Sequence, residues 1–217
     1  MIAKAPPVKL LRAAARKDVV PFTPEEIAAA MSHAEPRARL VLAIAASSGL
    51  RTGEILWLKW GDIEPDGTVH VRPKTYRLRS RGQWKEISWS PKSHQARTVV
   101  LPAEAMAELE AYRAKQRFSE PDFWVFQAQR GRNRMWARGS ETKLRAAFRA
   151  AGCYERGKLV HAIRHSFATA ASEAGTDLET LRQILGHGAL VTTALYLHSS
   201  KRKIRAAAER GSLLRRG

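Results

Sequence analysis

Cysteine is nearly absent from this sequence of 217 residues, which contains only Cys153. A single thiol excludes an internal disulfide bond and a zinc site built from several cysteines. Cys153 is therefore interpreted as an ordinary buried thiol.

Long hydrophobic runs are also missing, although 44% of the residues are hydrophobic. No apolar run approaches the roughly 18 residues that a membrane-spanning helix needs. The first 16 residues contain neither an uninterrupted apolar stretch nor a small-residue cleavage site, so export is not expected. We expect a globular, cytoplasmic protein that is associated with the nucleoid and has no membrane partner.

Acidic residues are few, because 20 Asp and Glu stand against 38 Lys and Arg and give a formal net charge of +18. Such an excess of positive charge favours a polyanionic partner, most simply nucleic acid. Charge alone is also compatible with a ribosomal or merely basic protein. The length suits one domain with a short arm at each end and leaves no room for a second large domain.

Hydrophobic periodicity predicts an α+β fold, a mainly α-helical domain with a small antiparallel sheet of three or four strands. Thr23 and Thr176 are each followed three residues later by Glu, which predicts two capping boxes. Gly49 is expected to end a helix over residues 36–48. Alternating patterns predict strands over residues 68–72, 84–89 and 97–101. Further helices are expected over residues 54–60, 103–117, 140–151, 161–173, 177–185, 191–197 and 201–210.

Several residues suit the cleavage of a phosphodiester by a side-chain oxygen, which needs a nucleophile, cationic donors and a proton for the leaving hydroxyl. Tyr196 is a candidate nucleophile, and His161 and Arg164 share one face of a predicted helix. Arg51 follows a helix-ending glycine, where Glu54 is placed to hold it by a bidentate pair. Each has a plainer explanation when taken alone: a core tyrosine, a basic helix face and a surface ion pair.

As a set, these motifs resemble the catalytic domain of the tyrosine recombinases, the phage-integrase type of enzyme. That family carries an arginine after a Gly-Leu step with an acidic residue three later, a lysine in a sheet turn, an HxxR motif, and a Gly-His pair nine residues before a tyrosine. The corresponding residues are Arg51 with Glu54, Lys92, His161 with Arg164, His187 and Tyr196. The flanking sequences LKWGDI at 58–63, RHSFAT at 164–169 and LGH at 185–187 also agree, and the resemblance covers roughly residues 22–200.

The resemblance implies a site-specific recombinase or integrase that cleaves and rejoins DNA through a 3'-phosphotyrosine, without metal, ATP or another cofactor. It assigns the nucleophile to Tyr196 and the proton donor for the leaving hydroxyl to Lys92. Arg51 and Arg164 would neutralise the phosphorane. His161 would assist proton transfer at the tyrosine, and the histidine at 187 would hydrogen-bond a phosphate oxygen.

The sequence departs from the family pattern between residues 71 and 91, where a basic insert lengthens the sheet. We interpret the insert as an extra hairpin that follows DNA, although a solvated loop fits the same residues. The expected DNA contacts are basic side chains of the insert and a histidine in the HxxR region, namely Lys74, Arg77, Arg79, Arg81 and His165. Lys74 and Lys85 are alternatives for the catalytic lysine, but Lys92 is preferred because RTVVLP follows it at 97–102.

Family members usually carry a separate helical domain before the catalytic one, whereas only about 20 residues precede the pattern here. We expect a basic N-terminal arm at 1–20, the catalytic domain at 21–200 and a basic C-terminal helix or tail at 201–217. This organisation fits a catalytic-domain fragment or a compact enzyme that relies on partner subunits. The expected partners are double-stranded DNA, further copies of the chain in a homotetramer on two DNA sites, and an accessory DNA-bending protein.

Three other functions share part of the pattern. A helix-turn-helix module fits residues 167–185 but leaves the arginine at 51, the lysine and the tyrosine unexplained, except in a recombinase relic that binds DNA without cleaving it. A metal-dependent nuclease would use the histidines at 161, 165, 187 and 198, but the clustered carboxylates of such sites are missing, so no metal site is expected. A type IB topoisomerase would use the same tyrosine chemistry and would relax supercoils without exchanging partners.

Overall fold

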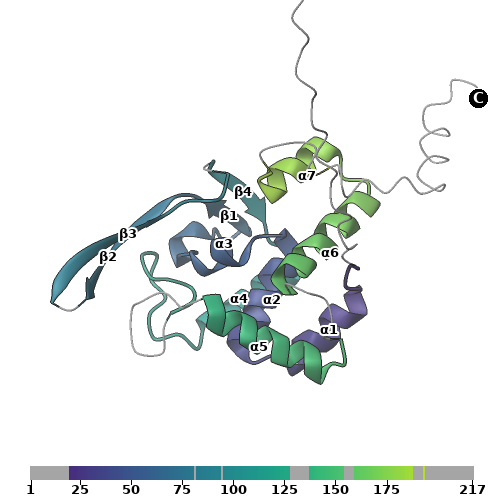
Figure 1. Ribbon diagram of the computed structural model, residues 1–217, viewed down its shortest axis with the longest axis horizontal. Helices are drawn as coiled ribbons and strands as arrows, with labels where there is room; N and C mark the ends of the chain where they lie inside the picture. Colours follow the sequence, from purple (N-terminus) through teal and green to yellow (C-terminus); the bar gives the residue numbers. More distant parts are fainter. Residues whose placement is uncertain are drawn as a thin grey trace, which may run out of the picture.

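The computed structural model describes residues 20–80, 82–93, 95–127, 137–153 and 159–187, together with Thr193. This part of the chain forms a helical body from which a two-stranded arm projects (Figure 1). No helix within these ranges is long and apolar enough to cross a membrane. The helices predicted over residues 191–197 and 201–210 lie outside the described residues.

The helices of the described ranges follow the predicted order along the chain. They are α1 (Pro24–His33), α2 (Pro36–Ser48), α3 (Thr52–Leu56), the short 3-10 helix η1 (Trp60–Asp62), α4 (Ala103–Arg113), α5 (Ala137–Ala150), α6 (Leu159–Glu173) and α7 (Leu178–Leu185). The helix predicted over 54–60 begins two residues earlier and ends sooner, because the chain turns into η1 after Trp57.

Two helix starts test the predicted capping boxes. The Thr23 hydroxyl accepts a hydrogen bond from the Glu26 backbone N–H at 3.2 Å, and the Thr23 N–H donates to the Glu26 carboxylate at 2.9 Å, so the first box is confirmed. The prediction of a second box at Thr176 is wrong. Asp177 caps α7 instead by accepting from the Thr180 N–H at 2.8 Å, because an aspartate one residue later is an equally good cap.

The strands divide into two small antiparallel sheets. β1 (Thr68–Val71) pairs with β4 (Arg97–Val100), and β2 (Lys74–Ser80) pairs with β3 (Gln83–Trp89). The predicted single sheet is therefore split, because the basic insert pairs only with its own return strand and leads away from the helices (Figure 1). The α+β class, with a mainly helical domain and small antiparallel sheets, is confirmed.

Helix α2 lies in the core and leads directly to the candidate site. It packs against α4, α5 and α6, and Leu42 and Ile44 are fully buried. Burial of one such side chain contributes about 1.5–3 kcal/mol. The helix ends at Gly49, which has a φ of 63° in the left-handed region. Arg51, two residues after Gly49, is therefore held in place by the packing of α2.

An aromatic cluster fixes the base of the projecting hairpin. Tyr76 of β2 and Trp89 of β3 meet Trp57 and Trp124 of the body, with ring centroids 5.4 to 5.6 Å apart. Aromatic pairs of this kind contribute about 0.5–1.5 kcal/mol each beyond the area they bury. The hairpin is thus attached to the body by packed rings as well as by its two chain connections.

Candidate phosphate-binding site

The carboxyl end of α7 binds arginines from three distant parts of the chain. Arg51 donates from Nη1 to the Leu185 carbonyl at 3.3 Å, and Arg164 donates to the same carbonyl from Nη2. Arg97 donates from Nε to the Ile184 carbonyl at 2.9 Å. The last carbonyls of a helix lack partners within the helix and carry partial negative charge, which favours guanidinium groups there. The end of α7 thus brings the two predicted arginines together.

Arg164 joins the ends of α2 and α7. Its side chain is buried, and Nη1 donates to the Gly49 carbonyl at 2.6 Å. A Cβ on Gly49 would lie 2.5 Å from Cδ1 of Phe167, closer than real side chains approach. Glycine is therefore required at this position both for its backbone conformation and for the close packing of α6.

Glu54 supplies the carboxylate of this cluster and is only 2% exposed. Its bidentate partner is Arg97, whose Nη1 and Nη2 lie 2.9 and 2.7 Å from the two carboxylate oxygens. Arg51 reaches the same carboxylate through its backbone N–H at 2.8 Å and through a single Nη1 contact at 3.2 Å. The bidentate pair expected between Glu54 and Arg51 is therefore formed with Arg97.

The arginines determine the charge state of Glu54. Burial raises the pKa of this carboxyl, but hydrogen bonds and charge from Arg97, together with the N–H and charge of Arg51, outweigh the burial and lower the pKa below its usual value. Glu54 is therefore ionised at neutral pH. Its negative charge is shared unequally between the two guanidinium groups, since Arg97 makes two contacts at 2.7 and 2.9 Å and Arg51 makes one at 3.2 Å.

Arg97 is a site residue that the motif pattern does not single out. In sequence it serves only to mark the RTVVLP stretch after Lys92. The available signal is a basic residue at the first position of a strand, β4, whose Val99 is buried. The partners of Arg97 lie 43 and 87 residues away, so no local pattern reveals them.

His187 follows Gly186, the residue that caps the end of α7, and is 7% exposed. Burial, and then the positive charges of the three arginines and of His161, lower its pKa from 6.5 to about 4. The imidazole is therefore neutral at pH 7. Its Nδ1 lies 2.9 Å from the hydroxyl of Thr193, a fully buried residue that the sequence patterns also did not indicate.

The cluster as a whole is suited to an anion. Three guanidiniums converge near one carboxylate, and the adjacent histidine is neutral, so the net charge is positive. Among the described residues, Nε and Nη2 of Arg51 have no hydrogen-bond partner, and 29% of its side chain is exposed. A phosphodiester oxygen fits such donors, because charge-assisted bonds from guanidinium to phosphate are strong and directional. The described ranges contain no group of three or more His, Cys, Asp or Glu side chains placed to hold a metal ion.

The remaining predicted catalytic residues have different surroundings. His161 is exposed on α6, one turn before the arginine of the same motif, and is close enough to affect His187. Lys92 is exposed in the turn between β3 and β4 and has no hydrogen-bond or ion-pair partner among the described side chains. Tyr196 lies outside the described residues, three positions after Thr193.

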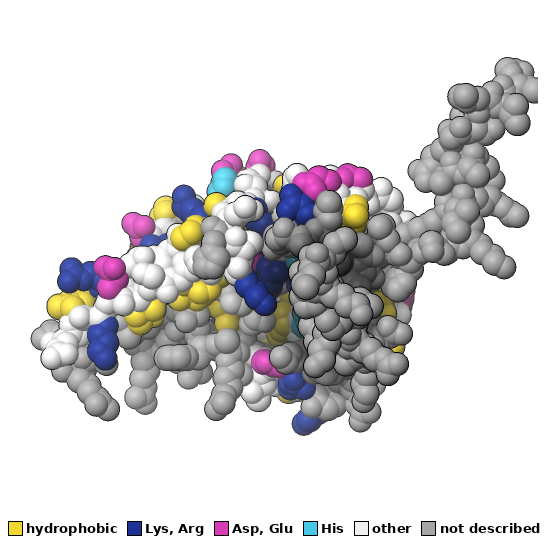
Figure 2. All heavy atoms as spheres, turned by 45° about the horizontal axis from the view of Figure 1, so that its top comes forward, with side chains coloured by type: hydrophobic (Ala, Val, Ile, Leu, Met, Phe, Trp, Pro, Cys, Tyr) yellow, Lys and Arg dark blue, Asp and Glu magenta, His cyan; other side chains and the backbone are white. Residues whose placement is uncertain are grey.

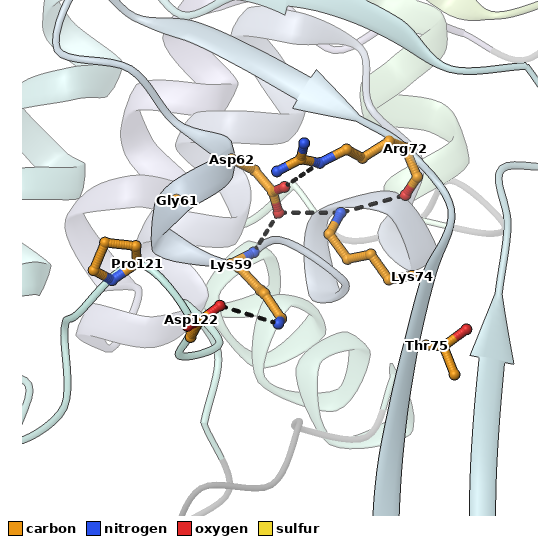
Figure 3. Close-up of a pocket in the computed structure, with 8 residues that line it drawn as sticks. All are labelled: Lys59, Gly61, Asp62, Arg72, Lys74, Thr75, Pro121 and Asp122. Atoms are coloured by element: carbon orange, nitrogen blue, oxygen red, sulfur yellow. Dashed lines mark hydrogen bonds and ion pairs between the residues drawn. The ribbon is translucent and has the colours of Figure 1, made fainter.

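Lys74 lies inside the protein at the base of the hairpin. Its Nζ is 3.0 Å from Asp62, and its side chain is 7% exposed. Arg72 Nε at 3.1 Å and the Lys59 N–H at 2.7 Å bind the same carboxylate, at a cavity of about 310 Å³ (Figure 3). Burial lowers the pKa of Lys74, Asp62 opposes this, and the charges of Arg72 and Lys59 lower it further. These contacts favour a role as an anchor of the hairpin over direct contact with DNA.

The outer part of the hairpin presents basic and aromatic side chains. Trp84 is 62% exposed, and the guanidinium of Arg77 lies 5.9 Å from its ring. Figure 2 shows Lys and Arg side chains along this arm beside hydrophobic ones. The Arg79 side chain and Arg81 lie outside the described part of the chain, and His165 is half-buried on α6.

Comparison with known proteins identifies relatives of the chain. The model of the phage integrase family matches residues 21–203. The tyrosine recombinase XerC of Leptospira interrogans is 31% identical over 172 residues, which cover 79% of this chain and 49% of the relative. The chain spans about half the length of the curated relatives it matches.

Solved structures share the fold. The crystal structure of XerA recombinase has a TM-score of 0.67 at 24% identity, covering 88% of this chain and 64% of that chain. The Tn1549 transposon integrase in complex with circular intermediate DNA has a TM-score of 0.70 at 21% identity, covering 90% and 68%. Since the family model matches most of the sequence and the folds agree, this chain belongs to the phage integrase family.

Proposed function

We propose that the chain is a tyrosine-type site-specific recombinase or integrase, which cleaves and rejoins DNA strands through a 3'-phosphotyrosine at Tyr196. The observation that carries the proposal is the convergence of Arg51, Arg164 and His187 at the end of α7. Family membership supports the same chemistry. ATP is not needed, because the phosphotyrosine conserves the energy of the broken bond, and the guanidinium groups supply the charge stabilisation that a metal ion would otherwise provide.

The arginine cluster stabilises the charge that develops on the phosphate. In-line attack gathers negative charge on the non-bridging oxygens, and fixed donors at that place lower the barrier without reorganising. Arg51 and Arg164 bind these oxygens, while neutral His187 hydrogen-bonds one of them. The loss of one such donor costs about 10²- to 10³-fold in rate.

Proton transfer requires groups on both sides of the phosphate. The Tyr196 oxygen forms a bond to phosphorus as the bond to the 5' oxygen breaks. His161 assists removal of the phenolic proton, and Lys92 donates a proton to the departing 5' oxygen. The exposed position of Lys92 in a turn supports this role, because the side chain is accessible to a DNA strand.

Double-stranded DNA is the proposed substrate. The Tn1549 integrase, which shares the fold, has been solved in complex with circular intermediate DNA, and the net charge of +18 on this chain suits a polyanion. The hairpin contributes Arg77, Arg79 and Arg81, and α6 contributes His165. Lys74 supports the hairpin from inside through Asp62.

Exchange of two duplexes needs four strand cuts and hence four protomers, each with one tyrosine. We therefore propose a homotetramer on two DNA sites, aided by a DNA-bending protein and located with the nucleoid in the cytoplasm. Residues 21–200 form the catalytic domain in this proposal. Residues 1–20 are the basic N-terminal arm and residues 201–217 the basic C-terminal helix or tail in the same proposal.

A suicide-substrate assay tests the chemistry. The purified chain is incubated in EDTA with a library of nicked duplexes, which includes the ends of any mobile element that encodes the chain, and the products are resolved on a denaturing gel. We expect a covalent adduct with the unchanged chain and with Tyr112→Phe, a control tyrosine in α4, but none with Tyr196→Phe. A folded chain that binds DNA and forms no adduct would contradict the cleavage proposal and favour a relic that only binds.

Two further readouts separate the related activities. Relaxation of supercoiled DNA without strand exchange would indicate a type IB topoisomerase. Cleavage that EDTA abolishes would indicate a metal-dependent nuclease, since metal-assisted hydrolysis needs the bound ion. Strand exchange in EDTA is the result that the recombinase proposal requires.

A further inference from the structure

We propose that Arg97 is a positioning residue of the reaction, which occupies Glu54 so that Arg51 remains available to the scissile phosphate and which holds the end of α7 in place. This inference rests on the proposed function, because it concerns the site at which the phosphate would bind. Arg97 itself does not contact the phosphate in this proposal.

The donors of Arg97 are already engaged. Nη1 and Nη2 bind the two oxygens of Glu54, and Nε binds the Ile184 carbonyl, all at 2.7 to 2.9 Å. The side chain is 9% exposed, compared with 29% for Arg51. Because all three nitrogens of this buried guanidinium donate to the protein, Arg97 can affect the reaction only by positioning the groups that it binds. Arg51, which is more exposed and has two nitrogens without described partners, is the residue that can meet a ligand.

Arg51 and Arg97 compete for the carboxylate of Glu54, and this competition explains how Arg97 keeps Arg51 available to a phosphate. Glu54 is buried and ionised, and its closest charged neighbours are these two arginines. A buried carboxylate without its bidentate partner is strongly unfavourable, so it recruits the next available cation. Without Arg97, that cation is Arg51, which already touches Glu54 at 3.2 Å. A closer pair between them would draw the donors of Arg51 away from the phosphate.

Arg97 also determines where α7 ends. Its guanidinium lies against Gly186, where a Cβ would be 2.7 Å from Nη1 and 2.8 Å from Cζ. The next residue is His187, and the preceding carbonyl is the one that receives Arg51 and Arg164. A displaced guanidinium would therefore shift the contacts of all three groups. Misplacement of catalytic groups by about 1 Å can cost on the order of 100-fold in rate.

The first test compares three variants of the full chain in single-turnover cleavage of a nicked duplex at saturating DNA. Arg97→Met removes both the charge and the bidentate hydrogen bonds of the guanidinium, and Arg97→Lys keeps the charge but cannot form the bidentate pair. Arg39→Met is the matched control, because Arg39 forms a bidentate pair with Glu108 about 15 Å back along α2. We expect Arg97→Met to slow cleavage on the order of 100-fold with nearly unchanged DNA affinity, Arg97→Lys to fall between, and the control to cleave normally.

Two results would overturn the competition step. The double variant Arg97→Met with Glu54→Gln is expected to recover at least about 10-fold of the lost rate, because an uncharged amide no longer holds Arg51. The proposal fails if the double variant is as slow as the single one. It also fails if folded Arg97→Met cleaves at the normal rate.

A second measurement does not require activity and therefore separates failure of this inference from failure of the proposed function. NMR titration of His187 without DNA is expected to give a higher pKa in Arg97→Met than in the unchanged chain, and a pKa near the original in Arg97→Lys, because a nearby positive charge lowers it. An unchanged pKa in Arg97→Met would contradict the placement of Arg97 in the cluster, whether or not any variant cleaves DNA.

Displacement of the guanidinium without a change of charge gives an independent check. Gly186→Ala places a methyl group against Arg97, whereas Gly152→Ala introduces an equally strained backbone at the end of α5 with nothing within 4 Å. Both variants carry the strain of a left-handed residue, about 1–2 kcal/mol. We expect only Gly186→Ala to slow cleavage by the folded protein. Equal rates for the two variants would contradict the role of Arg97.

Discussion

At the scale of single residues, the neutral state of His187 distinguishes the site from an ordinary basic surface. The imidazole is surrounded by cations, and its burial alone disfavours a further charge. A neutral ring can still hydrogen-bond a phosphate oxygen. Its hydrogen bond with Thr193 holds the ring in a fixed orientation.

The pH dependence of stability should report this neutral histidine. The pKa of His187 is about 4 in the folded chain, against 6.5 ordinarily, so protonation favours the unfolded state. Its contribution to stability is fully present above pH 6.5 and is lost as the pH falls towards 4. We expect the melting temperature to fall more steeply over this window in the unchanged chain than in His187→Gln, as measured by thermal unfolding.

The control for that experiment is His33→Gln, at an exposed histidine at the end of α1. It should follow the unchanged chain throughout the titration. Parallel curves for the unchanged chain and His187→Gln would show that His187 is not held neutral.

The sequence predicts site roles for Arg51, Glu54, His161 and Arg164 because each belongs to a short motif. It could not reveal that the guanidinium of Arg97 binds Glu54 more closely than that of its neighbour Arg51 does, since that choice depends on β4 lying against α7, from where Arg97 reaches Glu54. The burial of Lys74 was equally hidden. In sequence it is one of several basic residues in the insert, whereas the fold places it against Asp62.

At the scale of elements, the hairpin depends on a buried ionic anchor as well as on its aromatic base. Asp62 is fully buried and accepts from Lys74, Arg72 and the Lys59 N–H. When one partner of a buried ion pair is removed, the protein is strongly destabilised, because the other charge is left buried without compensation. Substitution of Asp62 and substitution of Lys74 are therefore expected to lower the free energy of unfolding by different amounts.

Urea unfolding should show that inequality. Asp62→Asn leaves buried Lys74 without a counter-charge, and we expect it to lower the free energy of unfolding by about 3 kcal/mol. Lys74→Met leaves Asp62 with Arg72 and a backbone donor, and we expect a loss of about 1 kcal/mol. An equal or larger loss for Lys74→Met would contradict the assignment of Asp62 as the centre of the anchor.

Local rules predicted most helix ends but not the pairing of the strands. The end of α2 and the start of α1 follow from Gly49 and Thr23, whose capping contacts lie within four residues. Strand pairing depends on which segments meet in space. An alternating hydrophobic pattern predicts that a segment is a strand, but it does not predict the partner of that strand. The motif also cannot predict which of Thr176 and Asp177 caps α7, since both residue types are good N-caps.

At the scale of the whole molecule, basic side chains lie both in the arginine cluster and on the projecting hairpin. Figure 2 shows basic side chains on the arm at some distance from the body. Neutralisation of phosphates by such residues releases counterions, so affinity for DNA falls with added salt. The hairpin is expected to contribute a measurable part of this dependence.

Salt titrations of DNA binding can measure that part. The double variant Arg77→Gln with Lys85→Gln removes two exposed charges of the hairpin, and we expect the slope of log affinity against log salt to become shallower by about 2. Arg39→Gln with Lys143→Gln removes two charges from the helical body, where each pairs with a glutamate, and serves as the control. An identical slope for the hairpin variant and the unchanged chain would exclude the hairpin from the DNA interface.

The arginines of the site and their hydrogen-bond partners are far apart in the sequence, so the site can form only late in folding. Arg51 meets Leu185 across 134 residues, Arg164 meets Gly49 across 115, and Arg97 meets Ile184 across 87. Contacts of such separation form only after costly loop closure, so a chain that is still emerging from the ribosome or is partly unfolded lacks them. A fragment that ends before α6 has neither Arg164 nor His187. Only a completely folded molecule therefore brings all of these groups together at the end of α7.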